Sequence, residues 1–481
     1  MFEPENAENE IQFLNRKDVK VQTWNSFKLQ IPPTVYPPRE DTDLLNEALK
    51  TIPPFGTKNL LEIGSGSGAL SISAAKLGWN VDACDINPFS VAATQHNAAK
   101  AGVEVSVSEG GIGPRDEQSY AWQPGTYDIV LWNMPYIPAD EIGDQLLGPL
   151  EEAALIDTHP EGLLTVFART MANNLLCKMN GIALLVCREH VGWRRSVDIL
   201  RQHGLAARIV RTHTFEDDEA IHVLAAWHPF VSNKHHRVRE IDSTNAELLR
   251  GQYAPGDSLT AQIQTSGRGR HGRSWQDHPQ SFKGSWVLDE KILSSIDLKM
   301  QLFVAHEISH ALTLNEQHIE QLNIKWPNDL LLREKTEQQW RKFGGILFQS
   351  YSKGSEQRMV LGLGINTAAD NLSEGQGSLA QLGIEVSNLE LFTILNAVVA
   401  SLFEAKHAAL ETGLEQAIND DVVLKECIYR NRMCILIDIE STGITLTDDS
   451  GRSFKVDDDD QIEWVSPVSY THLRAHETRT Y

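Results

Sequence analysis

The sequence is poor in cysteine, in basic residues and in long apolar stretches. Its 481 residues include 5 cysteines, none in a Cys-x-x-Cys pair. This argues against a zinc site built from paired cysteines and against a disulfide framework. Lys and Arg total 43 against 65 Asp and Glu, which gives a formal net charge of −22. A chain this acidic is a poor candidate for broad nucleic-acid binding, which needs a basic face.

Two further absences concern location. No stretch approaches the roughly 20 apolar residues of a membrane span. The chain begins Met-Phe-Glu-Pro-Glu, without the basic residues of a signal peptide. We therefore expect a cytoplasmic protein. Hydrophobic content of 41% and charged content of 22% are those of an ordinary soluble globular protein. At roughly 100–200 residues per domain, the length predicts two to four domains.

A glycine-rich loop between a strand and a helix is the first strong pattern. The apolar strand Asn59–Ile63 leads into Gly64-Ser-Gly-Ser-Gly68, then the helix Ala69–Leu77 and the strand Val81–Asp85. This order is typical of the opening of a doubly wound nucleotide-binding fold, with Asp85 placed to bind a ribose diol. The glycine spacing differs from that of dinucleotide sites, and a tight strand-to-helix turn is the alternative.

A second motif follows the apolar strand Tyr127–Trp132, where the chain reads Asn133-Met-Pro-Tyr136. An asparagine side chain offers both an acceptor and a donor. With the Met134 carbonyl it would hold a planar nitrogen, and Tyr136 would supply a stacking face. An ordinary Asn-x-Pro turn is the alternative.

Together these segments resemble the class I S-adenosylmethionine methyltransferases. With the leader Tyr36-Pro-Pro-Arg-Glu-Asp-Thr they are similar to the protein-glutamine methyltransferases that modify release factors, over about residues 30–228. The resemblance implies an S-adenosylmethionine site at Gly64, Gly66, Gly68, Asp85 and Asn133, with Asn133 catalytic. It also implies that Asn133, Met134, Pro135 and Tyr136 position the methyl acceptor, whose identity stays open. Met134 stands where the family usually has proline.

Alternating helices and strands complete this α/β region. We expect helices at Glu161–Met179 and Trp193–His203, and strands at Ile182–Cys187, Ala207–Thr212 and Ile221–Ala226. A polar, proline-punctuated break then places the boundary near 230–236. His235 and His236 in this break are more typical of a solvated linker than of a metal pair.

The second half is organised around Gln264–Trp275, which holds three glycines, three arginines and one histidine and no acid. Glycine lets successive N–H groups form a nest for an anion, and arginine adds a planar fork of donors. A cationic loop in an acidic protein predicts a pocket for a small anion.

Other polar clusters stand at the ends of strand-like runs, as strands feeding one pocket would place them. They are Ser243–Asn245, Asn323–Asp329, Lys342 before Gly344-Gly345, and Gly362–Asn366. Asp329 is a candidate ligand for Mg²⁺ held with phosphate oxygens. Ser243, Thr244 and Asn245 are equally consistent with a helix N-cap.

In this order the motifs resemble the biotin protein ligases, over about residues 238–368. The resemblance implies ATP-dependent formation of biotinyl-adenylate and transfer of biotin to a lysine of a carrier domain, with Lys342, Arg270 and Arg268 catalytic. It places biotin contacts on Ser243, Thr244, Asn245, Gln264, Arg268, Gly269, Arg270 and Lys342. Lys325, Asn328, Asp329 and Asn366 fall on the nucleotide and metal side. Gln349 stands where the family often has an acid.

The C-terminal region reads as a helix over 388–419 and then as short strands over Val423–Val465, which we interpret as a small β-barrel. The acids Asp457–Asp460 suggest a solvated loop or a cation site. Residues 468–481 change character abruptly, and we expect this tail not to be native and the true C-terminus to be missing.

We therefore predict an α/β protein with a doubly wound methyltransferase-like domain over 1–230, an α+β ligase domain over 236–420 and a small barrel over 421–467. The predicted cofactors are ATP, biotin, Mg²⁺ and S-adenosylmethionine, and the predicted partner is a biotin carboxyl carrier protein. No DNA-binding domain is detected. Two alternatives stay open: a non-catalytic N-terminal docking module, and a ligase half that only binds biotin or lipoate.

Overall fold

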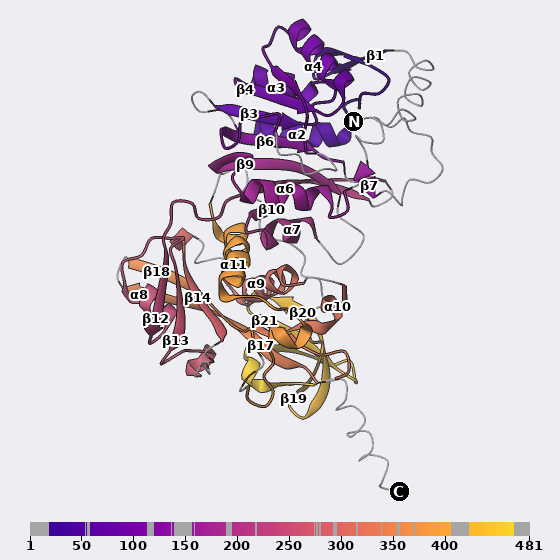
Figure 1. The fold of residues 1–481 in the computed structure, drawn as a ribbon. Helices are drawn as coiled ribbons and strands as arrows, with labels where there is room; N and C mark the ends of the chain where they lie inside the picture. Colours follow the sequence, from indigo (N-terminus) through magenta and orange to yellow (C-terminus); the bar gives the residue numbers. More distant parts are fainter. Residues whose placement is uncertain are drawn as a thin grey trace. The chain divides into compact units, whose positions relative to one another are not determined.

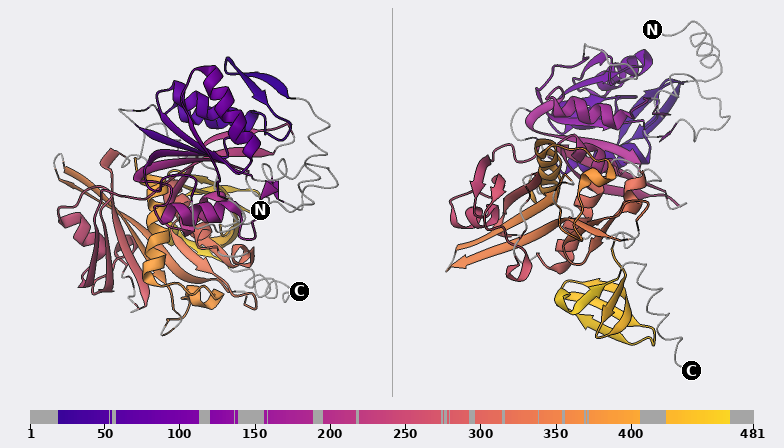
Figure 2. Two further views of the ribbon diagram at one scale, coloured as in Figure 1. Left: turned by 45° about the horizontal axis from the view of Figure 1, so that its top comes forward. Right: turned by 60° about the horizontal axis from the view of Figure 1, so that its bottom comes forward.

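The computed structural model divides the chain into two compact units, with the main division between Val231 and Ser232 (Figures 1 and 2). It describes residues 19–52, 54, 58–112, 120–135, 137–138, 156–157, 159–188, 195–216, 219–273, 275, 278, 280–291, 296–313, 316–337, 339–353, 356–368, 370, 372–405 and 423–465. Tyr136, residues 406–419 of the expected long helix and the tail 468–481 lie outside these ranges. Within them, no helix is long and apolar enough to cross a membrane.

The first unit is built on a seven-stranded sheet in the order β10-β11-β9-β6-β3-β4-β5. Its strands are β3 (Asn59–Ile63), β4 (Asn80–Asp85), β5 (Ser106–Glu109), β6 (Tyr127–Asn133), β9 (Cys177–Arg188), β10 (Ala206–Thr214) and β11 (Ala220–Trp227). The strands from β5 to β9 run parallel, and β11 is antiparallel to both of its neighbours. Nearly continuous burial along β3, β6 and β9 shows that both faces of the sheet are covered. The predicted doubly wound sheet is confirmed.

The helices that the structure describes in this unit are α2 (Glu40–Lys50), α3 (Ala69–Lys76), α4 (Pro88–Ala101), α6 (Leu163–Ala172) and α7 (Ser196–Gln202). A hairpin of β1 (Lys20–Trp24) and β2 (Phe27–Ile31) and a short pair of β7 (Ile137–Pro138) and β8 (Ile156–Asp157) complete it. The expected helix Glu161–Met179 is too long at its C-terminus. It ends at Ala172 because Asn174 takes a left-handed φ of 59°, and the chain then enters β9 at Cys177.

The second unit holds another seven-stranded sheet, in the order β12-β13-β14-β18-β17-β16-β15. Its strands are β12 (His235–Ile241), β13 (Ser258–Gln264), β14 (Ser281–Leu288), β15 (Leu322–Lys325), β16 (Asp329–Leu332), β17 (Arg341–Lys353) and β18 (Glu356–Asn366). Only the β12–β13 pair is parallel. Every residue of β14 is buried, which makes this strand the centre of the core.

In the described part of this unit, the sheet is accompanied by α8 (Thr244–Arg250), α9 (Leu298–Ala311), α10 (Glu316–Gln321) and α11 (Asn388–Phe403). Ser243 caps α8 by accepting a hydrogen bond from the Ala246 N–H, so the N-cap interpretation of this residue is correct. Ser387 and Glu390 form a capping box at the start of α11, where the sequence predicts the helix to begin.

The chain ends in a five-stranded antiparallel sheet, called here the C-terminal sheet. It comprises β19 (Glu426–Tyr429), β20 (Arg432–Glu440), β21 (Gly443–Asp448), β22 (Ser453–Val456) and β23 (Ile462–Trp464), in the order β22-β21-β20-β19-β23. Figure 2 shows it as a curved body, in yellow. It stands where the sequence predicts a small barrel. It is tied to the large sheet by a hydrogen bond from the Leu424 N–H to the Ile324 carbonyl, at 3.0 Å.

Two candidate active sites

A pocket opens in the first unit where the parallel strands β3, β4 and β6 end. The glycine loop that follows β3 forms one wall, because Gly64, Gly66 and Gly68 all take positive φ, between 54° and 81°. Only glycine adopts these angles without strain. Gly68 does not line the pocket, but a Cβ there would lie 3.0 Å from Thr94, so this glycine lets α3 and α4 pack closely.

Three carboxyl groups line this pocket, called here the acidic pocket. Asp85 ends β4 and accepts hydrogen bonds from the Gly66 and Asn87 N–H groups, at 2.8 and 2.9 Å. Its burial nevertheless raises its pKa. Glu62, 3% exposed, accepts a hydrogen bond from the Ser71 hydroxyl, and burial raises its pKa to about 8. Asp41 is the third acid of the lining, and no Lys, Arg or His lines the pocket among the described residues.

The motif after β6 lies at the same pocket. Asn133, Met134 and Pro135 line it, and the Asn133 Oδ1 atom is buried without a hydrogen-bond partner among the described groups. A buried acceptor without a partner is costly unless a ligand donates to it. Met134 is 4% exposed and its sulfur lies 3.7 Å from the Cys187 sulfur. The residue that departs from the expected proline is therefore packed into the core.

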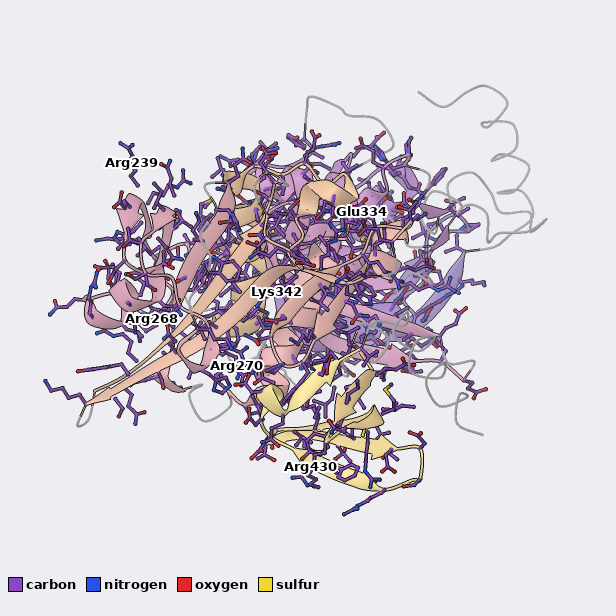
Figure 3. The ribbon with its side chains drawn as sticks, turned by 90° about the horizontal axis from the view of Figure 1, so that it is seen from below. Arg239, Arg268, Arg270, Glu334, Lys342 and Arg430 are labelled. Atoms are coloured by element: carbon purple, nitrogen blue, oxygen red, sulfur yellow. The ribbon has the colours of Figure 1, made fainter. Side chains whose placement is uncertain are left out.

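The second unit carries a pocket of the opposite charge, called here the cationic pocket. Figure 3 shows Arg268 and Arg270 of the glycine and arginine loop and Lys342 of β17. The pocket is lined from α8, from the loop, from β16 to β18 and from the C-terminal sheet. The predicted residues that line it are Ser243, Thr244, Asn245, Gln264, Arg268, Gly269, Arg270, Asn328, Asp329 and Lys342.

Two predicted residues are not in this lining. Lys325 lies at the end of β15, with its Nζ atom 4.0 Å from the Asp329 carboxylate. Asn366 ends β18 and donates from Nδ2 to the Gly377 carbonyl at 3.1 Å, while its Oδ1 atom is buried without a partner among the described groups.

A chain of hydrogen bonds fixes one wall of the cationic pocket. The Thr244 N–H and hydroxyl both donate to Gln264 Oε1, at 2.7 and 3.0 Å. The Ser285 hydroxyl approaches the Thr244 hydroxyl at 2.7 Å and Asn245 Oδ1 at 2.6 Å. Asn245 in turn donates to Gln349 Oε1 at 2.8 Å. Gln349, noted in the sequence as a departure, therefore orients Asn245. A Cβ at Gly362 would overlap the Asn245 side chain, so glycine is needed there.

The opposite wall holds the lysine. Lys342 Nζ lies 2.5 Å from Asp329 Oδ1 and 5.9 Å from the centre of the Trp275 ring. Asn328 secures the strand beside it through a 2.5 Å hydrogen bond from Nδ2 to the Ile346 carbonyl. Asp329, the predicted Mg²⁺ ligand, is thus an ion-pair partner of Lys342, and its role toward a metal stays a prediction.

Comparison with known proteins separates the two halves. Residues 237–366 match the family model described as the biotin/lipoate A/B protein ligase family. Residues 42–156 match that of the ribosomal protein L11 methyltransferase. A Methanocaldococcus jannaschii protein, named as a protein N5-glutamine methyltransferase, is 30% identical over 204 residues, covering 42% of this chain and 95% of the relative.

For the second half, the bifunctional ligase/repressor BirA of Salmonella typhimurium is 30% identical over 241 residues, covering 47% of this chain and 70% of the relative. With the Escherichia coli protein of the same name, the match covers 63% of the relative. The C-terminal half belongs to the biotin protein ligases and the N-terminal half to the protein-glutamine methyltransferases. A solved biotin protein ligase from Aquifex aeolicus, in complex with biotin and ATP, matches 48% of this chain and 99% of that chain at 21% identity, with a TM-score of 0.38.

The ligase half contains a further motif, which is not among the sequence patterns described above. Residues 306–310 read His-Glu-Ile-Ser-His, the spacing that zinc metalloproteases use on a helix. In α9 of this ligase half, however, His306 and Glu307 are 4% and 1% exposed, and His306 Nδ1 lies 3.1 Å from the Glu307 carboxylate. Among the described residues, these side chains are not part of any cluster of three metal-binding groups. The motif belongs to the packed core.

Sequence reasoning also missed Trp275, Arg273 and Asp459 as lining residues of the ligase pocket. Trp275 and Arg273 both lie within the segment Gln264–Trp275, so the pattern that predicts an anion pocket there could also have indicated these two residues. Asp459 comes from the C-terminal sheet, 188 positions after His271, which it contacts at 3.3 Å. No local pattern connects these two segments.

Proposed function

We propose that this chain is a bifunctional enzyme. Its ligase half forms biotinyl-adenylate from biotin and ATP, with release of pyrophosphate, and transfers biotin to a lysine of a carrier protein. Its methyltransferase half transfers the methyl group of S-adenosylmethionine to a nitrogen, as in protein glutamine or a similar amide. The observation that carries the ligase proposal is the convergence of Arg268, Arg270 and Lys342 in one pocket with the polar wall Thr244–Gln264.

The charges of the cationic pocket suit the first ligase step. In this step the biotin carboxylate oxygen attacks the α-phosphate of ATP, so two anions must meet. Arg268, Arg270 and Lys342 reduce that repulsion, and preorganised cations of this kind contribute a few kcal/mol at a transition state. The glycines of the loop bring backbone N–H groups close to the same anions.

The two walls of the pocket suit different substrates. On the wall formed by Ser243, Thr244, Asn245 and Gln264, neutral donors and acceptors suit the uncharged ring of biotin. On the other wall, Asn328 and Asp329 lie beside Lys342, and we assign this side, with Lys325 and Asn366 behind it, to the nucleotide. Once Lys342 turns toward the substrate anions, the Asp329 carboxylate would be free to hold Mg²⁺ together with phosphate oxygens of ATP.

The methyltransferase proposal rests on the buried Asn133 Oδ1 atom, which has no hydrogen-bond partner among the described groups. An N–H of an amide nitrogen would satisfy it and would be held in place for methyl transfer. In the acidic pocket, the Asp41 and Asp85 carboxylates suit a positively charged sulfonium cofactor, whereas Glu62, whose pKa is raised to about 8 by burial, keeps its proton at neutral pH and adds no charge. S-adenosylmethionine supplies the methyl group when bound, and Asp85 and the glycine loop would hold its ribose and amino-acid parts.

The ligase proposal is tested by incubating the full chain with ATP, Mg²⁺, biotin and a carrier domain, and then measuring the mass of the carrier. We expect the mass of one biotinyl group to be added, and no addition when ATP or biotin is omitted. An unchanged carrier in the complete mixture would contradict the proposed transfer and leave the ligase half at most a binding module.

The methyltransferase proposal is tested by calorimetric titration of the full chain with S-adenosylmethionine, followed by incubation with a glutamine-containing peptide. We expect saturable binding and transfer of one methyl group to the side-chain amide. A chain that does not bind S-adenosylmethionine would favour a non-catalytic docking role for the N-terminal half.

A further inference from the structure

The acidic turn between β22 and β23 contacts the arginine loop of the cationic pocket. Asp459 Oδ1 lies 3.4 Å from an Arg270 terminal nitrogen and 3.3 Å from His271 Nε2. Asp460 forms an ion pair with Arg273. Two of the four consecutive acids that the sequence presents as a solvated loop or a cation site, Asp459 and Asp460, are thus counter-ions of the loop that is expected to bind substrate anions.

The Asp459 contact is shielded from water, unlike the Asp460 contact. The Asp459 and Arg270 side chains are 11% and 16% exposed, whereas those of Asp460 and Arg273 are 43% and 59% exposed. Ion pairs in fully exposed positions contribute little, while partial burial strengthens the attraction. Asp459 also lines the cationic pocket itself. Its carboxylate therefore lies where a substrate anion would meet Arg270.

Two of the pocket cations, Lys342 and Arg270, already have a carboxylate partner. Lys342 faces Asp329 at 2.5 Å and Arg270 faces Asp459. Arg268, which is exposed, has no ion pair among the described residues. A phosphate or carboxylate can thus reach Arg268 directly, but it must share Arg270 with Asp459 or replace that carboxylate.

The backbone of the loop explains why such a counter-ion is useful. His271 has a φ of 52° and Gly272 one of 76°, and the left-handed region costs a residue such as histidine roughly 1 kcal/mol. The Gly269 N–H donates to the Arg273 carbonyl at 2.7 Å, which closes a tight turn around them. Asp459 contacts this turn at both Arg270 and His271, so it stabilises a conformation that the loop alone does not favour.

We propose that Asp459 is an internal counter-anion that holds the arginine loop in this turn before the substrate binds and then gives up Arg270 to the substrate anion. This deepens, and for its ligand rests on, the ligase function proposed above. His271, Asp458 and Asp459 also offer three groups within 4.8 Å of one another, the spacing of a metal site. A divalent cation there would face Arg270 and Arg273, so the charges favour the counter-anion.

The first test uses limited proteolysis of the full chain by trypsin without any ligand, comparing Asp459→Asn with Asp457→Asn. Asp457 is exposed, forms no ion pair among the described residues and carries the same charge in the same turn, so it is a matched control. We expect cleavage after Arg268, Arg270 or Arg273, identified by mass, to be several-fold faster in Asp459→Asn alone. Equal rates in the two variants would overturn the proposal.

The second test measures ATP affinity by calorimetry in the same proteins. Removing a competing carboxylate is expected to tighten ATP binding by about two- to fivefold in Asp459→Asn, the range of a modest ion pair, with a smaller change in Asp457→Asn. Weaker binding in Asp459→Asn would overturn the proposal, because Asp459 would then support the ligand. If the wild-type chain binds neither ATP nor biotin, the ligase function fails, while the proteolysis without ligand still decides the role of Asp459.

Discussion

The two pockets of this chain have opposite charge. The acidic pocket is lined by Asp41, Glu62 and Asp85, and the cationic pocket by three arginines and Lys342 against Asp329 and Asp459. In a protein of net charge −22, an acidic pocket follows the background, whereas a cationic pocket has to be assembled against it. The difference matches the proposed ligands, a sulfonium cofactor in one half and a carboxylate and a phosphate in the other.

The pockets also differ in how they treat their charges. Glu62 and Asp85 are 3% and 8% exposed, so burial raises the pKa of both. The Lys342 side chain is 40% exposed, and Lys342 and Arg270 are balanced by ion pairs with Asp329 and Asp459. Buried groups control charge through their own protonation, and exposed groups control it through counter-ions and salt. The following predictions test this contrast, beginning with the largest expected effect.

Removing a pocket cation should abolish biotin transfer. Lys342→Ala or Arg270→Ala leaves the two substrate anions without part of their compensation, and we expect a loss of about a hundredfold or more in the rate. The rate is measured from the mass of the carrier domain. Arg341→Ala is the control, because Arg341 pairs with Glu337 and does not line the pocket. Near-normal transfer by both pocket variants would contradict the site assignment.

Removing the buried acceptor of the acidic pocket should abolish methyl transfer. Asn133→Ala takes away the atom proposed to hold the methyl-accepting amide, and we expect about a hundredfold slower transfer. S-adenosylmethionine affinity, measured by calorimetry, should fall far less. Asn80→Ala changes an exposed asparagine at the start of strand β4 in the same sheet and should leave both quantities unchanged. A loss of binding as large as the loss of transfer would assign Asn133 to the cofactor alone.

Glu62 should make the stability of the methyltransferase half depend on pH. The pKa of this carboxyl is about 8 in the folded protein, well above its ordinary value of 4.5. The folded state keeps the proton that the unfolded state loses, so stability falls as the pH rises from about 4.5 to 8. Glu62→Gln should remove this slope and stabilise the protein at pH 8 by a few kcal/mol. Denaturant unfolding at pH 5 and pH 8 measures the difference, and parallel pH slopes would refute it.

Much of this contrast could be predicted from the sequence, because it rests on local patterns. Apolar runs and the glycines at Gly64–Gly68 predict the strand, loop and helix around the acidic pocket. The arginines of Gln264–Trp275 predict the cationic one. Both depend on residues a few positions apart, whose geometry follows from backbone sterics. The sequence predicts too long a helix after Glu161 because the turn at Asn174 contains no strong helix breaker such as proline or glycine.

The sequence does not predict the contacts between segments that are far apart in the chain. Asp459 reaches His271 across 188 positions, and nothing in a run of four acids indicates that contact. The Gln349 side chain orients Asn245 across 104 positions. The pKa of Glu62 depends on burial by the whole unit. The sequence therefore predicts the groups that bind ligands better than the groups that hold them in place.

Salt should weaken ligand binding more in the cationic pocket than in the acidic pocket, an effect smaller than those above. The Debye length shrinks from about 10 Å at ~0.1 M ionic strength to ~3 Å at 1 M, and screening acts most on charges that water reaches. ATP is highly charged and the ligase cations are partly exposed, so we expect ATP affinity to fall severalfold between ~0.05 and ~0.5 M salt. S-adenosylmethionine affinity should change by less than about twofold, because its pocket is lined by buried acids and its net charge is small. Calorimetric titration of the same full chain with each ligand provides the comparison. An equal salt dependence of the two affinities would show that the two pockets do not differ in how far water and salt reach their charges.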